Sequence, residues 1–427
     1  MSTDVSERMR FYRWVVFWVL AGGYILVYFH RLAPAVVAVD MMRDLQTGGS
    51  LTGFLGAAYF YPYALMQLPA GLLSDSWGPR NTISTFFLVA FAGSLVLAAA
   101  PSAMLAIAGR TLVGIGVAML FVPTLKVLSE WFSTQEFVRM TGLLMLMGGI
   151  GSLISTAPLA YLSSAIGWRG SFLVVAGLTL ALMILVRLFV FDRPADKGWP
   201  SPTHASAQSQ IQVGLWAGVR QVLACPYFWP MAVWFFCDAG IFFTFGGLWG
   251  GPFLMHLYGL SKAQAGQVLS MMALGLIIGS PFQAWLSNTV FKARKPVVVL
   301  STIIVCALTA VLAFLPQHIP MPGLYLICLG LGVFPSAVVV VVFTMTKEMF
   351  PVHMAGTSTG LINLFPFAGG AVLQPVLGAV LEAKGRVGDG FSVAGYRAAF
   401  SILFAAALVA LVCSLFLKET LTKPHEA

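Results

Sequence analysis

Three charged side chains fall inside long apolar stretches of the sequence: Arg31, Arg110 and Asp238. A charge at the centre of an apolar membrane helix costs about 2.5–3.5 kcal/mol on insertion scales, so each of the three should face protein or water instead of lipid. The guanidinium fork of an arginine matches the geometry of a carboxylate or a phosphate. Arg31 is therefore a candidate binding site for an anion.

Polar side chains lie close to Arg31 in the sequence. Candidate donors to the same substrate are Tyr28, His30 and Tyr59. Two alternatives are open for Arg31 itself, because a long basic side chain can also reach the outer membrane interface or pair with Asp40 or Asp44.

Asp238 is a carboxylate deep inside an apolar stretch of the second half. An isolated acid there is costly to ionise, which suits reversible protonation and predicts a role in proton coupling. Pairing with an arginine across a cavity is the structural alternative. For Arg110, a proton relay and hydrogen bonding to neighbouring backbone carbonyls are both open.

Further candidates for substrate binding are residues of the late apolar stretches: Trp249, Gln267, Asn363 and Gln374. Pro366 follows Asn363 closely and is expected to interrupt its helix, freeing backbone groups toward a cavity. Trp249 is expected to close the site from outside, and an interfacial aromatic belt is its alternative use. Helix–helix hydrogen bonding is open for each of the polar residues.

The composition places almost the whole chain in a membrane. Its 427 residues are 59% hydrophobic and 9% charged, with a mean hydropathy of +0.89, whereas a soluble chain carries about 25% charged residues. Since about 20 apolar residues cross the hydrocarbon core, the pattern predicts an all-α membrane protein of about twelve transmembrane helices. The predicted helices are 14–38, 51–73, 81–100, 103–128, 138–162, 170–191, 227–252, 264–287, 296–315, 322–345, 355–381 and 396–417.

A long polar segment at 192–225 divides these helices equally. It predicts an N-terminal six-helix bundle at 1–191, a cytoplasmic linker, and a C-terminal six-helix bundle at 226–427. The halves also resemble one another in sequence, as transporters built from internal repeats do. Matching pairs in the same order are Glu130-Trp131-Phe132 with Glu348-Met349-Phe350, and Gly167-Trp168-Arg169 with Gly395-Tyr396-Arg397.

The positions of the basic residues predict the orientation in the membrane and argue against nucleic-acid binding. The net charge is +9, but the basic residues lie in short loops instead of the clustered stripe that nucleic-acid binding requires. More of them lie on the N-terminal side of the membrane, which predicts that both termini are cytoplasmic. Scattered cysteines and the lack of a nucleophile–base pair or phosphate loop predict no metal site, no cofactor and no enzymatic activity.

A motif follows the second predicted helix: Gly71-Leu72-Leu73-Ser74-Asp75-Ser76-Trp77-Gly78-Pro79-Arg80. It resembles the G-x-L-x-D-x-x-G-x-[RK] signature of the major facilitator superfamily of transporters. The resemblance implies a gate in which Gly71 and Gly78 allow close helix approach and a tight turn. Asp75 and Arg80 would form bonds between the halves that break when the carrier changes state.

The gate departs from the family pattern in places. Pro79 stands where a basic residue is usual, and Asn288 replaces the matching acid in the second half, which implies a weaker second gate. Lys126 and Glu130 are four residues apart on a predicted helix and are expected to form a salt bridge that supports the gate.

Two further segments refine the resemblance. Arg110 to Gly116 is similar to the family's R-x-x-x-G-x-G pattern, whose small residues let helices touch. Drug antiporters of the family carry two sets of glycines on the fifth helix, and the stretch after Gly148 lacks the second set. Arg31 before Pro34 resembles the organic-anion and sugar-phosphate branches, in which this arginine contacts the substrate. Val117 and Ala118 stand where the transporters of those branches often carry a glutamate. The proton route of those transporters is therefore not assigned to this chain.

The function expected from these features is secondary active transport of a small organic anion, a carboxylate or an organic phosphate, by alternating access with proton coupling. The expected partners are the anionic substrate, H⁺ and the lipid bilayer of the cell membrane, with the protein as a monomer. One alternative is efflux of hydrophobic or cationic compounds, with Asp238 serving the cation. The other is a receptor of transporter fold that binds a ligand without moving it.

Overall fold

The computed structural model describes residues 3–199, 215–351, 354–388 and 390–421, and these are almost entirely helical. Within them, 11 helices are long and apolar enough to cross a membrane. The regular elements before residue 200 are α1 (Thr3–Leu32), α2 (Pro34–Asp44), α3 (Gly49–Ala57), α4 (Phe60–Leu65), α5 (Gln67–Ser76), α6 (Pro79–Ala99), α7 (Ala103–Ala118), α8 (Phe121–Trp131), α9 (Thr134–Ile154), α10 (Ala157–Phe189) and the 3₁₀ turn η1 (Pro194–Lys197).

The elements after residue 214 include three short π-helical segments, η2, η3 and η4, and one antiparallel hairpin. They are α11 (Leu215–Leu223), α12 (Phe228–Thr244), η2 (Phe245–Trp249), α13 (Gly250–Tyr258), α14 (Lys262–Trp285), η3 (Leu286–Val290), α15 (Lys295–Phe314), α16 (Met321–Leu331), η4 (Gly332–Ser336), α17 (Val339–Met349), α18 (Ala355–Ala383), β1 (Arg386–Val387), β2 (Gly390–Phe391) and α19 (Val393–Leu415).

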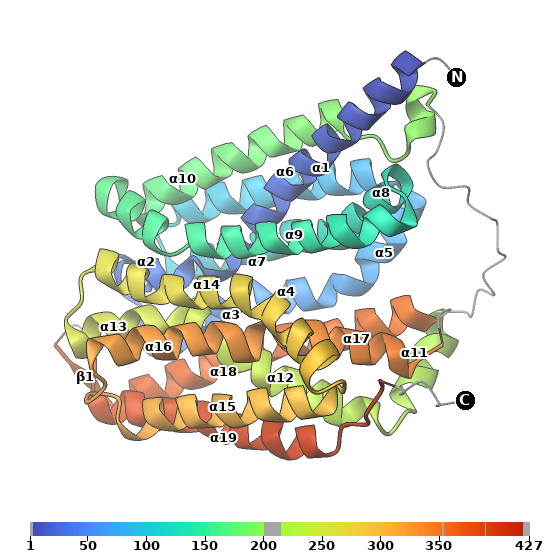
Figure 1. Cartoon of the computed structure of the whole chain (residues 1–427). Helices are drawn as coiled ribbons and strands as arrows, with labels where there is room; N and C mark the ends of the chain where they lie inside the picture. Colours follow the sequence, from blue (N-terminus) through green and yellow to red (C-terminus); the bar gives the residue numbers. More distant parts are fainter. Residues whose placement is uncertain (1–2, 200–214, 352–353, 389, 422–427) are drawn as a thin grey trace.

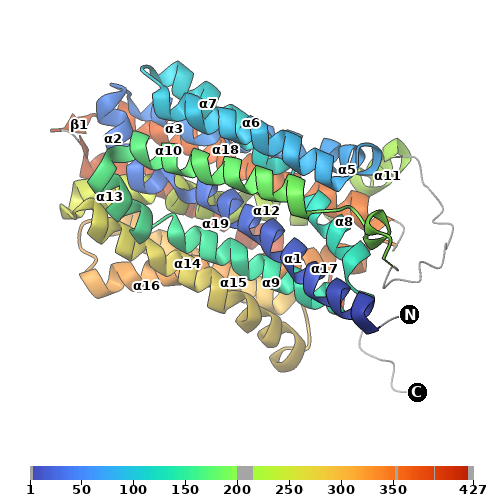
Figure 2. The same ribbon diagram turned by 90° about the horizontal axis from the view of Figure 1, so that it is seen from above.

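The helices form two groups that lie against one another (Figure 1). The first group, α1 to α10, occupies the upper part of the view and the second group, α11 to α19, the lower part. Contacts between the groups run through α3 and α18, α2 and α13, and α10 and α14. Both chain ends lie at one end of the molecule, called the terminal end, and the β1–β2 hairpin lies at the other, called the hairpin end (Figures 1 and 2).

Prolines interrupt several of the predicted helices. The predicted helix 51–73 is divided into α3, α4 and α5, and none of these pieces alone is long enough to cross a membrane. Pro62 and Pro69 lack the N–H that would bond to the carbonyl four residues earlier, and the two interruptions lie at or directly after those earlier positions. In the same way the predicted helix 14–38 ends at Leu32, and a second helix begins at Pro34.

A glycine separates two helices within α10. Gly167 has φ 74° and ψ 167°, so it interrupts the helical backbone between residues 157–166 and 168–189. A residue with a side chain would be strained at this φ. The interruption lies between the predicted helices 138–162 and 170–191, and α9 and α10 also meet at a short break after Ile154.

The predicted interruption at Pro366 is wrong. The helix α18 is continuous from Ala355 to Ala383 and contains both Pro366 and Pro375. A proline inside a membrane helix is tolerated where neighbouring helices support the backbone, and α12 and α3 pack along α18. The second group departs from a regular helix at its π segments instead.

Glycines allow α6 and α7 to pack closely. A side chain at Gly116 would place its Cβ 2.5 Å from the backbone nitrogen of Ala90, and one at Gly109 would lie 2.6 Å from the nitrogen of Leu97. Gly116, which belongs to the small-residue pattern after Arg110, therefore lets helices touch as the sequence predicted.

We expect Gly116→Ala to lower the apparent melting temperature of the purified protein by several degrees, because overpacking a tight helix contact costs about 1–3 kcal/mol. The matched control is Gly177→Ala on α10, where nothing lies within 4 Å of the added Cβ. Thermal unfolding in detergent measures both variants. Equal melting temperatures would contradict the close approach of α6 and α7.

Candidate functional site

Arg31 lies near the end of α1 and is 4% exposed. Its guanidinium carbon is 4.3 Å from the ring centre of Tyr28, 4.9 Å from Phe367, 5.1 Å from Tyr63 and 5.5 Å from Phe243. The negative faces of aromatic rings attract a cation, by about 2 kcal/mol where water is excluded. These rings come from α1, α4, α12 and α18, so both groups of helices enclose the charge.

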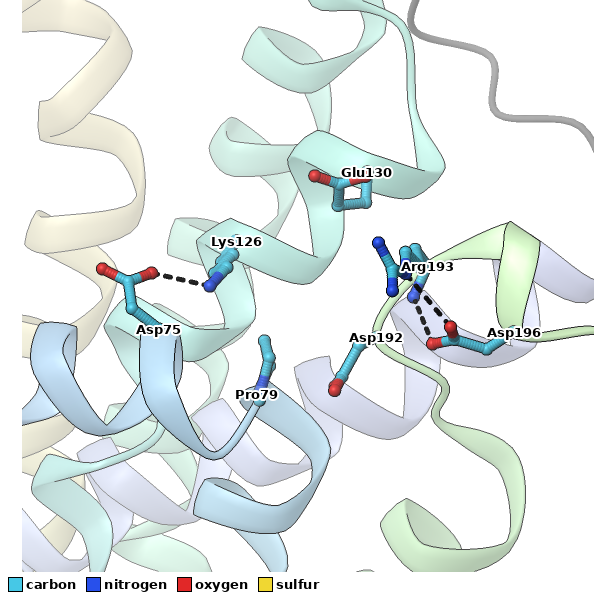
Figure 3. A pocket seen from close by; sticks show the side chains of 8 residues that line it. Asp75, Pro79, Lys126, Glu130, Asp192, Arg193 and Asp196 are labelled. Carbon is cyan, nitrogen blue, oxygen red and sulfur yellow. Dashed lines mark hydrogen bonds and ion pairs between the residues drawn. The ribbon is translucent and has the colours of Figure 1, made fainter. Parts of the chain in front are cut away.

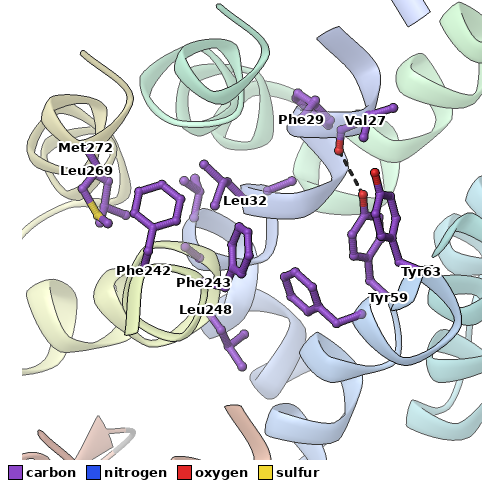
Figure 4. Packing of buried hydrophobic residues seen from close by; sticks show 14 of the residues in the cluster. Val27, Phe29, Leu32, Tyr59, Tyr63, Phe242, Phe243, Leu248, Leu269 and Met272 are labelled. Atoms are coloured by element: carbon purple, nitrogen blue, oxygen red, sulfur yellow. Dashed lines mark hydrogen bonds between the residues drawn. The ribbon is translucent and has the colours of Figure 1, made fainter. Parts of the chain in front are cut away.

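A cavity of about 90 Å³ opens beside Arg31 between the two groups. Tyr28, Arg31, Ser336 and Asn363 supply its polar side chains. The rest of the lining is apolar, and Phe243 of α12 points toward α1 in the packing around it (Figure 4). A concave site with few polar groups placed on an apolar surface is typical of small-molecule binding.

Arg31 has no carboxylate partner among the described residues. Asp40 instead pairs with Lys262, and Asp44 accepts hydrogen bonds from Trp168 (2.9 Å) and Arg169 (2.8 Å). Burial opposes ionisation of Asp44, but these hydrogen bonds outweigh it and hold its pKa below the ordinary value. The alternative in which Arg31 pairs with Asp40 or Asp44 is therefore wrong for this structure.

The remaining residues predicted around Arg31 lie in different places. Asn363 lines the cavity, and its amide donates to Gln67 Oε1 at 3.0 Å. Tyr59 is buried behind the cavity and donates to the Val27 carbonyl oxygen at 3.1 Å (Figure 4). His30 is fully buried and stacks on Phe172, so its ring does not join the lining.

Three other candidates make contacts between helices and do not line the cavity. The Trp249 indole donates to the Gln374 carbonyl oxygen at 2.9 Å, and the Gln374 amide donates to the Phe243 carbonyl oxygen at 2.9 Å. Gln267 donates to the Tyr161 hydroxyl at 3.0 Å. Gln374 and Gln267 thus make the helix–helix hydrogen bonds that were their alternative interpretation.

Arg110 and Asp238 are both buried away from the cavity lining. Arg110 donates to the His30 carbonyl oxygen at 2.8 Å and lies over the Tyr59 ring. Both carboxylate oxygens of Asp238 lack a hydrogen-bond partner. Asp238 therefore pairs with no arginine in the described part of the chain, and an unpartnered buried carboxylate is held most easily with a proton bound.

The motif at residues 71–80, which includes the end of α5, lies at the terminal end (Figure 2), and Figure 3 shows several of its side chains from close by. Asp75 accepts a hydrogen bond from Lys126 at 2.6 Å, and the backbone N–H of Arg80 donates to Asp192 at 2.6 Å. Burial raises the pKa of Asp192 above its ordinary value. Gly78 adopts φ 84°, which gives the tight turn expected there.

Three expectations about this motif need correction, and the first concerns Gly71: nothing lies within 4 Å of a Cβ added there, so it marks no close helix approach. Lys126 pairs with Asp75 and not with Glu130, because its side chain points toward the α5 end of the motif (Figure 3). Asp75 bonds within the first group instead of across the interface of the halves. In the second group Asn288 accepts from Arg294 at 2.5 Å, and Arg294 also pairs with Glu348 at 3.1 Å.

Apart from the hydrogen bond of Asn363 with Gln67 beside the cavity, the described polar contacts between the two groups lie toward the hairpin end. Lys262 of α14 pairs with Asp40 of α2 and donates to Ser163 at 3.1 Å. Glu382 accepts from the backbone N–H of Ser50 at 2.9 Å. The side chains of Lys262 and Asp40 are 14% and 15% exposed, so water screens their attraction only partly.

The ion pairs described at the terminal end stay within one group. Arg13 with Glu136 and Lys126 with Asp75 belong to the first group, and Arg294 with Glu348 belongs to the second. The described contacts therefore close the hairpin end more firmly than the terminal end.

Sequence reasoning missed several of these residues. Tyr63 lies four residues after Tyr59 and so shares its helix face, which could have revealed it. Phe243 and Phe367 carried no signal among the many phenylalanines of the apolar stretches. Lys262 was assigned to a loop, and nothing in the sequence joins it to Asp40 across 222 residues.

The family model described as Major Facilitator Superfamily matches residues 20–375 and, in a second match, 251–427. The chain belongs to the Major Facilitator Superfamily. It is a multi-pass membrane transporter, and it is not an enzyme. The family assignment that the gate motif suggested from the sequence is confirmed.

Curated members of the Major Facilitator Superfamily resemble the chain over most of its length. It is 24% identical to the hexuronate transporter of Escherichia coli (strain K12), over 87% of this chain and 88% of that one. It is 21% identical to a probable galactarate/D-glucarate transporter of Bacillus subtilis (strain 168), over 97% and 96%. It is 21% identical to a probable hexose phosphate transport protein of Chlamydia pneumoniae, over 96% and 91%.

Solved structures of this superfamily share the fold. A bacterial homolog of the human lysosomal transporter Spinster, in an inward-facing and unoccupied conformation, matches with a TM-score of 0.74 and 16% identity. The match covers 95% of this chain and 96% of that chain. A mutant of the nucleoside transporter NupG matches with a TM-score of 0.72 and 13% identity, over 93% and 100%.

We expect Lys262→Met to open the hairpin end, because it removes the ion pair that joins the groups there, and a hydrogen bond to a charged group contributes about 1.5–3 kcal/mol. Spin labels at the exposed Met104 and Gln317 report the separation of the groups by pulsed electron resonance. The five native cysteines are first replaced.

The matched control is Arg169→Met, which removes an ion pair at the same end but within the first group. Lys262→Met should increase the population of long distances, whereas Arg169→Met should leave it unchanged. The same shift in both variants would show that Lys262 does not specifically hold the groups together.

Proposed function

We propose that the protein is a secondary active transporter that moves a small organic anion across the cell membrane by alternating access. The observation that carries the proposal is the guanidinium of Arg31, which is buried, faces a cavity between the two groups and has no carboxylate partner among the described residues. A charge held this way is costly unless a ligand uses it. The substrates named for the relatives, hexuronate, galactarate and hexose phosphate, are anions as well.

The two groups of helices serve in this proposal as the two six-helix bundles, joined by the segment 192–225. The broken segment α3–α5 is the twelfth membrane-crossing unit, added to the 11 helices that are long enough alone. The hairpin end faces outward in this proposal, and the basic residue distribution supports cytoplasmic termini. The polar contacts described at the hairpin end join the two groups, whereas the ion pairs described at the terminal end lie within one group. This distribution supports an inward-facing state. The protein works as a monomer.

Proton coupling in this proposal uses Asp238. Its carboxylate is buried without a hydrogen-bond partner among the described residues, so proton binding and release change the charge at a place where charge is expensive. Arg110 holds the nearby end of α1 through the His30 carbonyl and thereby positions Arg31. The inward gate consists of the motif around Asp75 and Arg80 with Lys126.

Efflux of a cation has less support. Asp238, the carboxylate that would bind the cation, does not line the cavity, whereas Arg31 does. A positive charge in the site repels a cationic substrate. The receptor alternative is tested by flux, because a receptor binds its ligand without moving it.

We expect Arg31→Ala to reduce uptake of an organic anion into proteoliposomes by at least about a hundredfold, the equivalent of about 2.7 kcal/mol in binding. Arg31→Lys should retain only part of the activity, because an ammonium lacks the planar fork that matches a carboxylate. Arg397→Ala, an exposed arginine at the hairpin end, is the control. Normal uptake by a folded Arg31→Ala protein would overturn the assignment.

We expect Asp238→Asn to abolish accumulation driven by an inward proton gradient while exchange of labelled for unlabelled anion continues. The amide keeps the shape of the carboxyl group but cannot release a proton. Glu7→Gln, at an exposed acid near the N-terminus, is the control. Gradient-driven accumulation that survives in Asp238→Asn would move the coupling site elsewhere in the protein.

A further inference from the structure

The cavity beside Arg31 is far less polar than sugar acids and sugar phosphates require. Its described lining carries a single cationic side chain, Arg31, and three other polar ones, Tyr28, Ser336 and Asn363. The amide of Asn363 already donates to Gln67. Most of the surface is hydrocarbon, from Phe235, Phe242, Phe243, Leu276, Val339 and Phe343.

We propose that the substrate is a monocarboxylate with an apolar body, and not a polyhydroxylated sugar acid or a phosphate ester. This inference rests on the function proposed above and narrows its substrate class. The carboxylate lies against the Arg31 guanidinium, and the body lies on the phenylalanine rings of α12 and the side chains of α14 and α17.

Hydrogen-bond supply excludes the sugar acids. A hexuronate carries a hydroxyl group on most of its carbon atoms, and each one loses its bonds to water when the substrate is enclosed. The cavity has too few free donors and acceptors among its described residues to replace those bonds, so several hydroxyls would stay unpaired. A hydrocarbon body has no hydrogen bonds to water to lose, and burying it against the apolar lining is favourable.

Charge excludes the phosphate esters and the diacids. A phosphate monoester carries about −1.5 to −2 charges near neutral pH, and a diacid carries two carboxylates. Arg31 is the one cation among the described residues that line the cavity, since Arg110 lies behind it against the His30 carbonyl. The second negative charge of such a substrate would be buried without a partner.

The aromatic rings around Arg31 also bear on the apolar body of the substrate. They cover the guanidinium from several sides, within 5.5 Å of four ring centres. A carboxylate bound to this guanidinium has its carbon chain beside these rings. The same rings that stabilise the cation therefore also contact the first part of the apolar body.

The test compares two six-membered-ring monoanions, cyclohexanecarboxylate and glucuronate, which differ mainly in their hydroxyl groups. Binding to the purified full-length protein is measured by calorimetry, together with glucose 6-phosphate and the neutral cyclohexanecarboxamide. We expect cyclohexanecarboxylate to bind at least tenfold more tightly than glucuronate and glucose 6-phosphate, and the neutral amide to bind at least tenfold more weakly than the acid. In Arg31→Ala the preference for acid over amide should disappear.

A lining variant tests the apolar surface directly. Leu276→Asn adds a polar side chain to the cavity and should reduce the ratio of the affinities for cyclohexanecarboxylate and glucuronate. Leu276→Met keeps an apolar side chain and should leave that ratio unchanged. If the wild-type protein binds glucuronate or glucose 6-phosphate as tightly as cyclohexanecarboxylate, or more tightly, the monocarboxylate inference is wrong. The proposed function as an anion transporter would be unaffected by that result. Failure of all three anions to bind, with binding of lipophilic cations, would instead overturn the proposed function itself.

Discussion

The need to hold one positive charge inside an apolar protein governs the centre of this structure. Arg31 is 4% exposed and no described acid pairs with it, so the faces of Tyr28, Tyr63, Phe243 and Phe367 stabilise its charge. Two of these rings belong to the first group of helices and two to the second. The environment of the charge is complete only while the groups are together, which links the binding residue to the relative position of the groups.

The sequence predicted the class of the fold because hydrophobic length and charge position have few other solutions in a membrane. It located most helices to within a few residues and identified Arg31 by the cost of its charge. It did not predict which residues surround Arg31, since an apolar stretch does not reveal which of its faces meets a partner helix. The partner of Lys126 was missed for a related reason: spacing on one helix favoured Glu130, whereas packing of α5 against α8 brought Asp75 closer.

The resemblance between the two halves extends to a contact that no local sequence pattern shows. Asp192 follows α10 and accepts from a backbone N–H at the start of α6, and Glu419 follows α19 and accepts from Arg294 and Lys295 at the start of α15. A carboxylate at a helix N-terminus satisfies free N–H groups and the helix dipole. Burial of Glu419 acts against ionisation, but these backbone hydrogen bonds keep its pKa below the ordinary value. In each half, a carboxylate that follows the last helix thus binds the N-terminus of the third membrane-spanning helix, α6 in the first half and α15 in the second.

The hairpin end closes largely by backbone meeting backbone. A side chain at Gly251 would overlap the Ala35 carbonyl, and Gly49 and Gly378 face one another with no side chain between them. The close approach of the groups at these positions therefore depends on residues that carry no side chain. Parting the groups here exposes backbone peptide groups to water and breaks the polar links, such as the ion pair of Lys262 with Asp40, that cross the hairpin end.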